Sequence, residues 1–210
     1  MSLLIDLFGY LVIVIHGLTI VSQSMMLGGV LFLTCLAQPK AATLGAAGIA
    51  ISRGTRRLTS WAALGLILCQ SATILLETAV LAGTIDLPAV DILQADFAVA
   101  ALVKIAAAII VAVLLRQPEA AVQPRPAQRI GLLLACLVEL IAATLTTHAA
   151  ARLDDRGILL AAAALHQFGA AIWIGGIPSF ILALKLVHDG IAWREIGARF
   201  SRLSMIGVAC

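Results

Sequence analysis

Residues 97–115 read FAVAALVKIAAAIIVAVLL, an apolar run in which Lys104 is the only charged side chain. A helix needs about 20 apolar residues to cross a lipid bilayer, so this stretch predicts a membrane-spanning helix. Similar runs at 4–36, 58–82, 130–147 and 158–187 predict four more spans. A sixth run opens near 203 and stops at 210, which predicts the start of a further span in a natural protein that continues beyond it.

The composition agrees with a membrane protein. Of 210 residues, 62% are apolar and 12% are charged, whereas soluble domains are about half apolar and about a quarter charged. An ordinary cytosolic protein is therefore excluded. The net charge of +3 is small and dispersed, which excludes nucleic acid as a main partner. The four cysteines lie in apolar runs without CxxC spacing, so neither a disulfide framework nor a zinc knuckle is indicated.

The basic residues alternate strictly between successive connections. Eleven follow the first, third and fifth spans, and two lie in the other connections. Because cytoplasmic loops are rich in Lys and Arg, this pattern predicts a cytoplasmic location for the three basic loops and a periplasmic N-terminus in a bacterial inner membrane. The eleven are Lys40, Arg53, Arg56, Arg57, Arg116, Arg125, Arg129, Lys185, Arg194, Arg199 and Arg202, and the two are Arg152 and Arg156.

These features predict an all-α transmembrane bundle with five complete spans, the start of a sixth, and an internal repeat. Residues 1–115 form three spans, 116–129 a Pro-rich cytoplasmic linker, and 130–210 the remaining region, truncated at its C-terminus. Segments 26–29 and 57–60 parallel 173–176 and 202–205 at offsets close to 146. A duplicated helical unit explains this parallel, and chance similarity between Gly-rich apolar helices is the alternative.

Three histidines are predicted in the outer half of the bundle. His148 ends the fourth span, His166 lies about two turns into the fifth, and His16 lies about three turns into the first. Imidazole binds copper, iron and zinc, and unpaired polar groups are costly in lipid, so an outward-facing metal site is predicted from these three residues. Hydrogen bonds to neighbouring helices are the alternative role.

Other side chains suit a path for ions. Met25 and Met26 offer soft sulfur ligands for copper about 13 Å further along the first helix than His16, although the sequence favours a packing role for both. Glu77, Lys104 and Glu139 are ionisable residues within spans and should be paired or face water. Glu77 and Lys104 are candidate partners for each other. Glu139 is a candidate proton or cation relay, with a structural hydrogen bond as the alternative.

The segments Thr147-His148-Ala149-Ala150, Leu165-His166-Gln167, 171–176 and 199–203 together resemble the bacterial copper resistance D family over about residues 146–208. The resemblance implies a polytopic inner-membrane protein that moves copper, with a periplasmic copper-binding protein of the copper resistance C type as partner. By that resemblance His148 and His166 match the family positions, and Trp173, Gly175 and Gly176 form the scaffold.

Three functions remain open from the residues alone. The first is copper transport through His148, His166 and His16, with other membrane subunits as further partners. The second is a b-type haem protein, because two histidines on neighbouring helices can supply both axial ligands. The third is a structural subunit of a membrane complex. The chain lacks a Ser/His/Asp pattern and a phosphate-binding Gly-rich loop, so we expect no enzyme activity.

Overall fold

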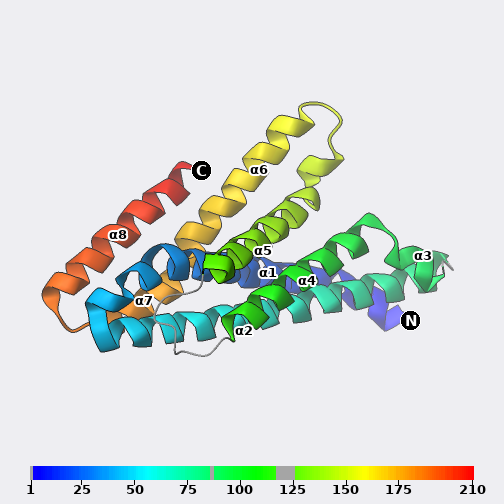
Figure 1. Ribbon diagram of the computed structural model, residues 1–210. Coiled ribbons are helices and arrows are strands. Elements are labelled where there is room, and N and C mark those ends of the chain that lie inside the picture. Colours follow the sequence, from blue (N-terminus) through cyan, green and yellow to red (C-terminus); the bar gives the residue numbers. More distant parts are fainter. Residues whose placement is uncertain (1, 86–87, 117–125) are drawn as a thin grey trace.

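The computed structural model describes residues 2–85, 88–116 and 126–210, and in these ranges the chain is helical without strands (Figure 1). The predicted all-α class is therefore confirmed. Asp86, between the second and third predicted spans, lies outside the described ranges, as do Arg125 and residues 117–124 of the predicted linker. The elements in order are α1 (Ser2–Phe32), η1 (Leu33–Ala37), α2 (Gln38–Ile85), α3 (Ala89–Leu93), α4 (Asp96–Leu115), α5 (Pro126–Leu145), η2 (His148–Ala151), α6 (Arg156–Ala170), η3 (Ala171–Gly175), α7 (Ile177–Leu186) and α8 (Gly190–Ala209).

Within α2, the chain reverses direction at Gly45, whose φ is 55° and ψ is −128°. A β-carbon at this position would meet no atom within 4 Å, so space does not require glycine there. The positive φ does, because only glycine adopts it without steric cost. The reversal divides residues 2–85 into two long helical arms that pack against each other.

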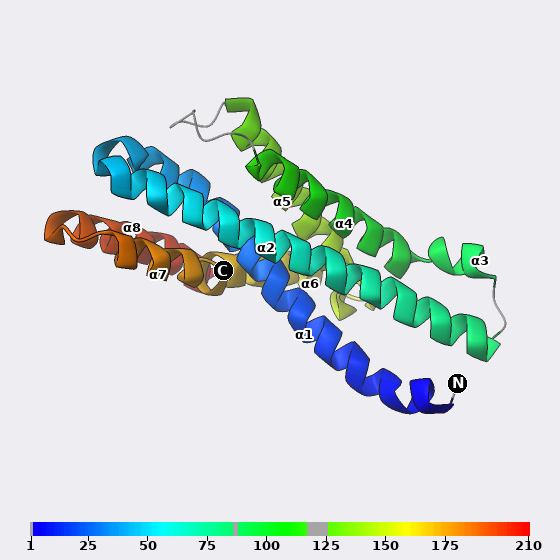
Figure 2. The ribbon, with the colours of Figure 1, turned by 90° about the horizontal axis from the view of Figure 1, so that it is seen from below.

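The Gly45 reversal and the α7–α8 connection share one end of the molecule (Figure 1). The reversal at Gly45 and the α7–α8 connection lie at the left of Figure 1, whereas the N-terminus and α3 lie at the right. The connection from α5 to α6 lies at the upper right of the same view. Seen from below, α4 runs beside α2 and next to α5 (Figure 2), in agreement with the extensive contacts of α4 with both helices.

Four helical segments of the described chain are long and apolar enough to cross a membrane: Leu7–Thr84, Asp96–Leu115, Pro126–Leu145 and Arg156–Leu186. The first contains nearly all of the first two predicted spans, with the Gly45 reversal between them. The last combines α6, η3 and α7 and corresponds to the fifth predicted span. Helix α5 begins at Pro126, within the predicted linker 116–129, and buried Gln128 donates a hydrogen bond to the Leu114 carbonyl.

Helix α4 shows the arrangement expected of a helix that packs on one side and faces lipid on the other. Its large side chains, among them Leu102 and Ile109, are exposed, while small residues such as Ala101 and Ala108 face the neighbouring helices. Lys104, its one lysine, is also buried. Small residues at helix contacts and large apolar residues outside are typical of membrane helices, because lipid accepts apolar side chains and close packing then holds the helices together.

The N-terminal arm crosses the α6–η3–α7 segment through glycines. A β-carbon on Gly28 would lie 2.2 Å from the Ala171 carbonyl oxygen, and one on Gly175 would lie 1.8 Å from the Ser24 carbonyl oxygen. Both contacts are with backbone, which cannot move aside cheaply. The two helices therefore meet backbone to backbone, and this crossing places α6 and its histidine relative to α1.

Candidate functional site

His148 is the first residue of η2, and Thr146 and Thr147 separate it from the end of α5. The Thr147 hydroxyl donates a hydrogen bond of 2.7 Å to the Thr144 carbonyl, which stabilises the end of the helix immediately before the histidine. The 3₁₀ turn that follows packs against α6. The side chain of His148 is exposed. This imidazole is therefore available to a ligand that approaches from outside the bundle.

His166 lies in the third turn of α6 and is also exposed. The next residue, Gln167, accepts a hydrogen bond of 2.9 Å from the side-chain amide of Gln23 on α1. Sequence reasoning missed this glutamine pair. The feature that could have indicated it is the presence of two glutamines within apolar runs, because a buried amide without a hydrogen bond is costly and needs a partner. The pair ties α6 to α1 directly beside the histidine.

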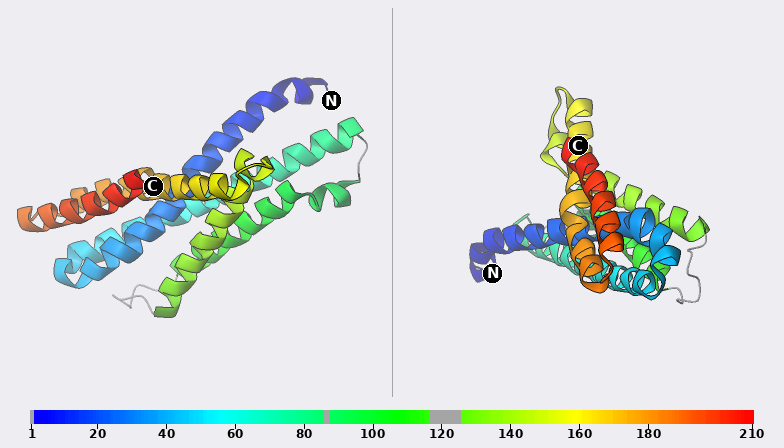
Figure 3. Two further views of the ribbon diagram at one scale, coloured as in Figure 1. Left: turned by 90° about the horizontal axis from the view of Figure 1, so that it is seen from above. Right: turned by 90° about the vertical axis from the view of Figure 1, so that its left-hand side faces the viewer.

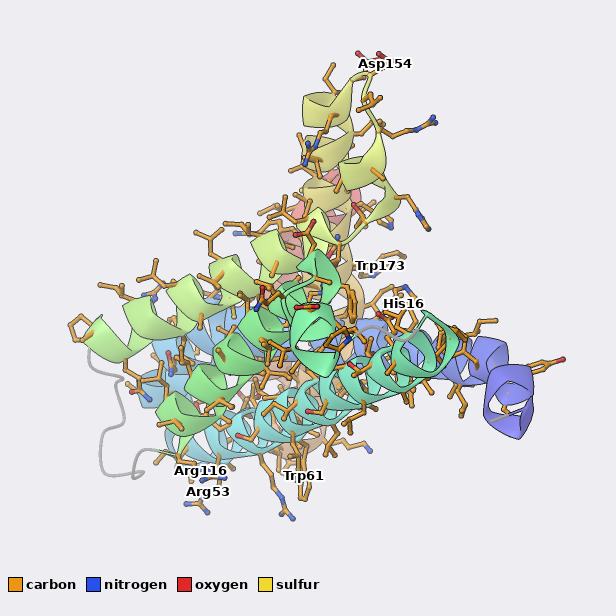
Figure 4. All side chains as sticks on the ribbon, turned by 90° about the vertical axis from the view of Figure 1, so that its right-hand side faces the viewer. His16, Arg53, Trp61, Arg116, Asp154 and Trp173 are labelled. Carbon is orange, nitrogen blue, oxygen red and sulfur yellow. The ribbon has the colours of Figure 1, made fainter. Side chains whose placement is uncertain are left out.

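His16 lies on α1, two helical turns before Gln23, and its side chain is exposed (Figure 4). The three histidines therefore come from three different elements: α1, η2 and α6. Among the residues that the structure describes, no three His, Cys, Asp or Glu side chains gather closely enough to hold a metal ion. The structure thus does not bring His16, His148 and His166 into one closed metal site.

The two methionines belong to the packed interior. Met26 is fully buried in the main apolar cluster, and Met25 packs against that cluster. This environment agrees with the packing role that the sequence favours for both. Trp173 is half exposed on η3, while Gly175 and Gly176 are buried at the helix crossing.

Lys104 on α4 and Glu139 on α5 are both buried, and the two helices pack against each other. The Lys104 ammonium donates a hydrogen bond of 2.9 Å to the Thr146 hydroxyl, and its charge interacts with that of Glu139. Glu139 is 0% exposed, and neither of its carboxyl oxygens has a hydrogen-bond partner among the described residues. The expected pairing of Lys104 with Glu77 is therefore wrong. Lys104 bonds instead to the turn at the C-terminal end of α5, because Thr146 lies directly after that helix and α5 packs against α4.

At the opposite end of the molecule, an ion pair joins α8 to the hairpin formed by α1, η1 and α2. The Lys40 ammonium forms an ion pair with the Glu195 carboxylate, which also lies 3.5 Å from an Arg199 guanidinium nitrogen. The hydrogen bond from Lys40 lowers the pKa of Glu195 from its ordinary value, and the charges of Lys40 and Arg199 lower it further. The sequence motifs did not predict this junction.

Comparison with protein-family models, with curated proteins and with solved structures finds no match to this chain. The site must therefore be judged on its own residues: two exposed histidines on the α5–η2–α6 hairpin, a third on α1, and a buried lysine and glutamate between α4 and α5.

Proposed function

We propose that this chain handles copper at a bacterial inner membrane, with His148 and His166 as the residues that receive the ion on the periplasmic side. The observation that carries the proposal is the position of the two histidines on one exposed hairpin, together with the resemblance of the flanking residues to the copper resistance D family. Copper is the cargo of this function, and the imidazoles hold it transiently.

The proposed topology has five crossings. The reversal at Gly45 separates the first two crossings, and the basic connections face the cytoplasm with the N-terminus outside. The shared end of the Gly45 reversal and the α7–α8 connection, opposite the N-terminus and α3, supports this topology (Figure 1). Under it, the α5–η2–α6 hairpin faces the periplasm, where copper arrives.

We also propose that the chain contains an internal repeat with an offset of 147 residues at the helix crossing. The contact of Gly28 with Ala171 and the contact of Gly175 with Ser24 are equivalent under that offset. Such reciprocity is what a two-fold relation between two copies of one unit produces. Both helices run from the outer to the inner end in the proposed topology, so the axis would lie along the membrane normal.

Exposed histidines suit a handover better than permanent binding. The described residues offer no group of three His, Cys, Asp or Glu ligands, so a copper ion bound here would keep some ligands of the protein that delivers it. The proposed delivering protein is a periplasmic protein of the copper resistance C type. The same exposure argues against the haem alternative. Two axial histidines must face each other in a slot between helices, whereas His16, His148 and His166 all lie on exposed surfaces.

The buried Lys104 and Glu139 give this function a candidate route for protons. An ionised side chain at the centre of a bilayer costs at least about 2.5 kcal/mol, so a carboxyl group without hydrogen-bond partners is an expensive feature there. Exchange of a proton at Glu139 would allow copper movement to be coupled to the proton gradient. Lys104 would set the charge beside it, and Glu77 stays a further candidate for the same relay.

Copper uptake by cells that express single and double histidine variants tests the proposal. We expect His148→Ala and His166→Ala each to remove most uptake, and the double variant to be little worse than either, because residues that act as one site are non-additive. His188→Ala, an exposed histidine near the opposite end, is the matched control and should keep uptake unchanged. Additive partial losses would contradict a shared role, and a Soret band in the purified protein would favour haem.

A further inference from the structure

A pocket of about 360 Å³ lies between the end of the first helical arm and α8. Its walls are Cys35 and Leu36 from η1, and Arg199, Arg202, Leu203 and Ile206 from α8. The α7–α8 hairpin lies alongside the α1–α2 hairpin at this end of the molecule in two different views (Figures 2 and 3). The pocket is therefore formed by two hairpins that are far apart in the sequence.

The side chains of the pocket are ordered along the helix axis. The α8 residues occur at spacings i, i+3, i+4 and i+7, which places them on one face of the helix. The two arginines come first and the two aliphatic residues follow. With a rise of 1.5 Å per residue, Ile206 lies about 10 Å further along the axis than Arg199. The face thus changes from cationic to apolar over about the length of two helical turns.

The charge at the cationic end is only partly neutralised within the described chain. Glu195 lies one turn before Arg199 and is shared between Lys40 and Arg199. Arg202 forms no ion pair with a carboxylate of the described residues, and the residues that line the pocket include no acid. Two guanidinium groups beside an apolar wall match a ligand with an anionic head and an aliphatic tail.

We infer that this pocket binds an anionic phospholipid, with the phosphate at Arg199 and Arg202 and an acyl chain along Leu203, Ile206 and Leu36. Guanidinium groups bind phosphate oxygens through paired hydrogen bonds. The apolar wall would contact part of one acyl chain of the same lipid. The cytoplasmic leaflet as the source of this lipid rests on the proposed topology, but binding itself does not. Binding requires neither copper nor the histidines.

Native mass spectrometry of the full chain in detergent micelles tests the inference. Phosphatidylglycerol is titrated in parallel with phosphatidylcholine of the same acyl chains. We expect phosphatidylglycerol to be retained at least about fivefold better, and the Arg199→Gln/Arg202→Gln variant to lose this preference. The Lys185→Gln/Arg194→Gln variant removes two exposed charges from the same end without touching the pocket, and it should keep the preference.

Two further measurements show which part of the lipid the pocket recognises. Inorganic phosphate at the same concentration should not compete, since it lacks the acyl chain, and competition by phosphate would reduce the site to an anion site and overturn the proposal. Equal loss in the pocket and control variants would likewise overturn it, as general charge would then explain binding. If the glutamine variant is unstable, Arg199→Lys/Arg202→Lys keeps the charge and should retain a weaker preference for phosphatidylglycerol, whereas unchanged retention of both lipids would count against guanidinium recognition.

Discussion

Gly28 lies where α1 and η3 touch through their backbones, so a methyl group at this position has no room. It would approach the Ala171 oxygen, the Gly175 carbonyl carbon and the Gly176 nitrogen to 2.2, 2.3 and 2.6 Å. We expect Gly28→Ala to lower stability by about 1–3 kcal/mol, the usual cost of forcing extra atoms into a packed interior. Thermal unfolding of the purified protein in detergent measures this change.

Gly17 is the matched control for that experiment, because it lies on the same helix and a β-carbon there would meet no atom within 4 Å. Alanine at this position should leave stability unchanged or raise it by up to about 1 kcal/mol, since alanine favours the helix. Equal melting temperatures for Gly28→Ala and Gly17→Ala would contradict the close crossing of α1 with η3.

The Thr146 hydroxyl is the hydrogen-bond acceptor for the buried ammonium of Lys104. Thr146→Val removes this acceptor and should cost about 1–3 kcal/mol, the penalty for a buried group left without its partner. In a Glu139→Gln background, used for every variant of this comparison so that no carboxylate depends on the Lys104 charge, replacing both residues as Lys104→Met/Thr146→Val should restore most of the stability because neither member of the hydrogen bond is then left without its partner. Thr84→Val, at an exposed threonine whose hydroxyl bonds only within its own helix, is the control. A double variant less stable than Thr146→Val would refute the pairing.

A substitution at Glu139 distinguishes copper transport from copper binding in the proposed function. Its carboxyl group is buried and unpartnered among the described residues, so Glu139→Gln keeps the shape of the side chain but cannot exchange a proton. We expect copper uptake to fall about tenfold or more while copper binding by the purified protein stays unchanged. Normal uptake by this variant would leave Glu139 with a structural role only.

Among the elements, α8 is held to the first hairpin by an ion pair that depends on pH. Because the pKa of Glu195 is lowered in the folded protein, its contribution to stability is present above the ordinary glutamate pKa of about 4.3 and is lost as the pH falls through the lowered folded value. Glu195→Gln should therefore melt at a lower temperature than the original protein near pH 7. The difference should disappear when melting is measured at a pH below the folded pKa.

The control for this pH dependence is Asp154→Asn, which removes an exposed carboxylate from the connection between α5 and α6. It should not reproduce the loss of stability near neutral pH. A gap between the original protein and Glu195→Gln that persists unchanged at low pH would show that the carboxylate does not stabilise α8 through its charge.

The helices were predictable from the sequence wherever the length of an apolar run alone determines where a helix begins and ends. The run 97–115 becomes α4 (Asp96–Leu115) almost residue for residue, because its apolar length defines both ends. The first two helices extend well beyond their predicted spans 4–36 and 58–82, since helices continue past the apolar region until a breaker such as Gly45. Apolar length carries no information about that extension.

The candidate site was less predictable, because it depends on how helices cross. The sequence identified His148 and His166 as residues worth attention, but their spacing along the chain does not determine the distance between α1, η2 and α6. That distance follows from backbone contacts at Gly28 and Gly175 and from the Gln23–Gln167 hydrogen bond. Likewise, the partner of Lys104 follows from which helix packs against α4 and not from depth in the membrane.

For the whole molecule, the central prediction is orientation. Figure 4 shows Arg53 and Arg116 on the same side of the molecule and Asp154 at the opposite tip. The proposed topology places the two arginines in the cytoplasm and the aspartate in the periplasm, because basic loops are retained inside. Single cysteines at these positions, in a background with the four native cysteines replaced by serine or alanine, report the side of the membrane through an impermeant thiol reagent applied to intact cells.

We expect Asp154→Cys and Asp91→Cys to be labelled in intact cells, and Arg53→Cys and Arg116→Cys to be labelled only after the membrane is permeabilised. Permeabilised cells, in which all four positions should react, control for local burial of the thiol; all four residues are exposed in the structure. The reverse pattern would move the histidine hairpin to the cytoplasm and contradict periplasmic capture of copper. It would not affect the phospholipid pocket, whose binding in detergent is independent of orientation, so the two proposals can fail separately.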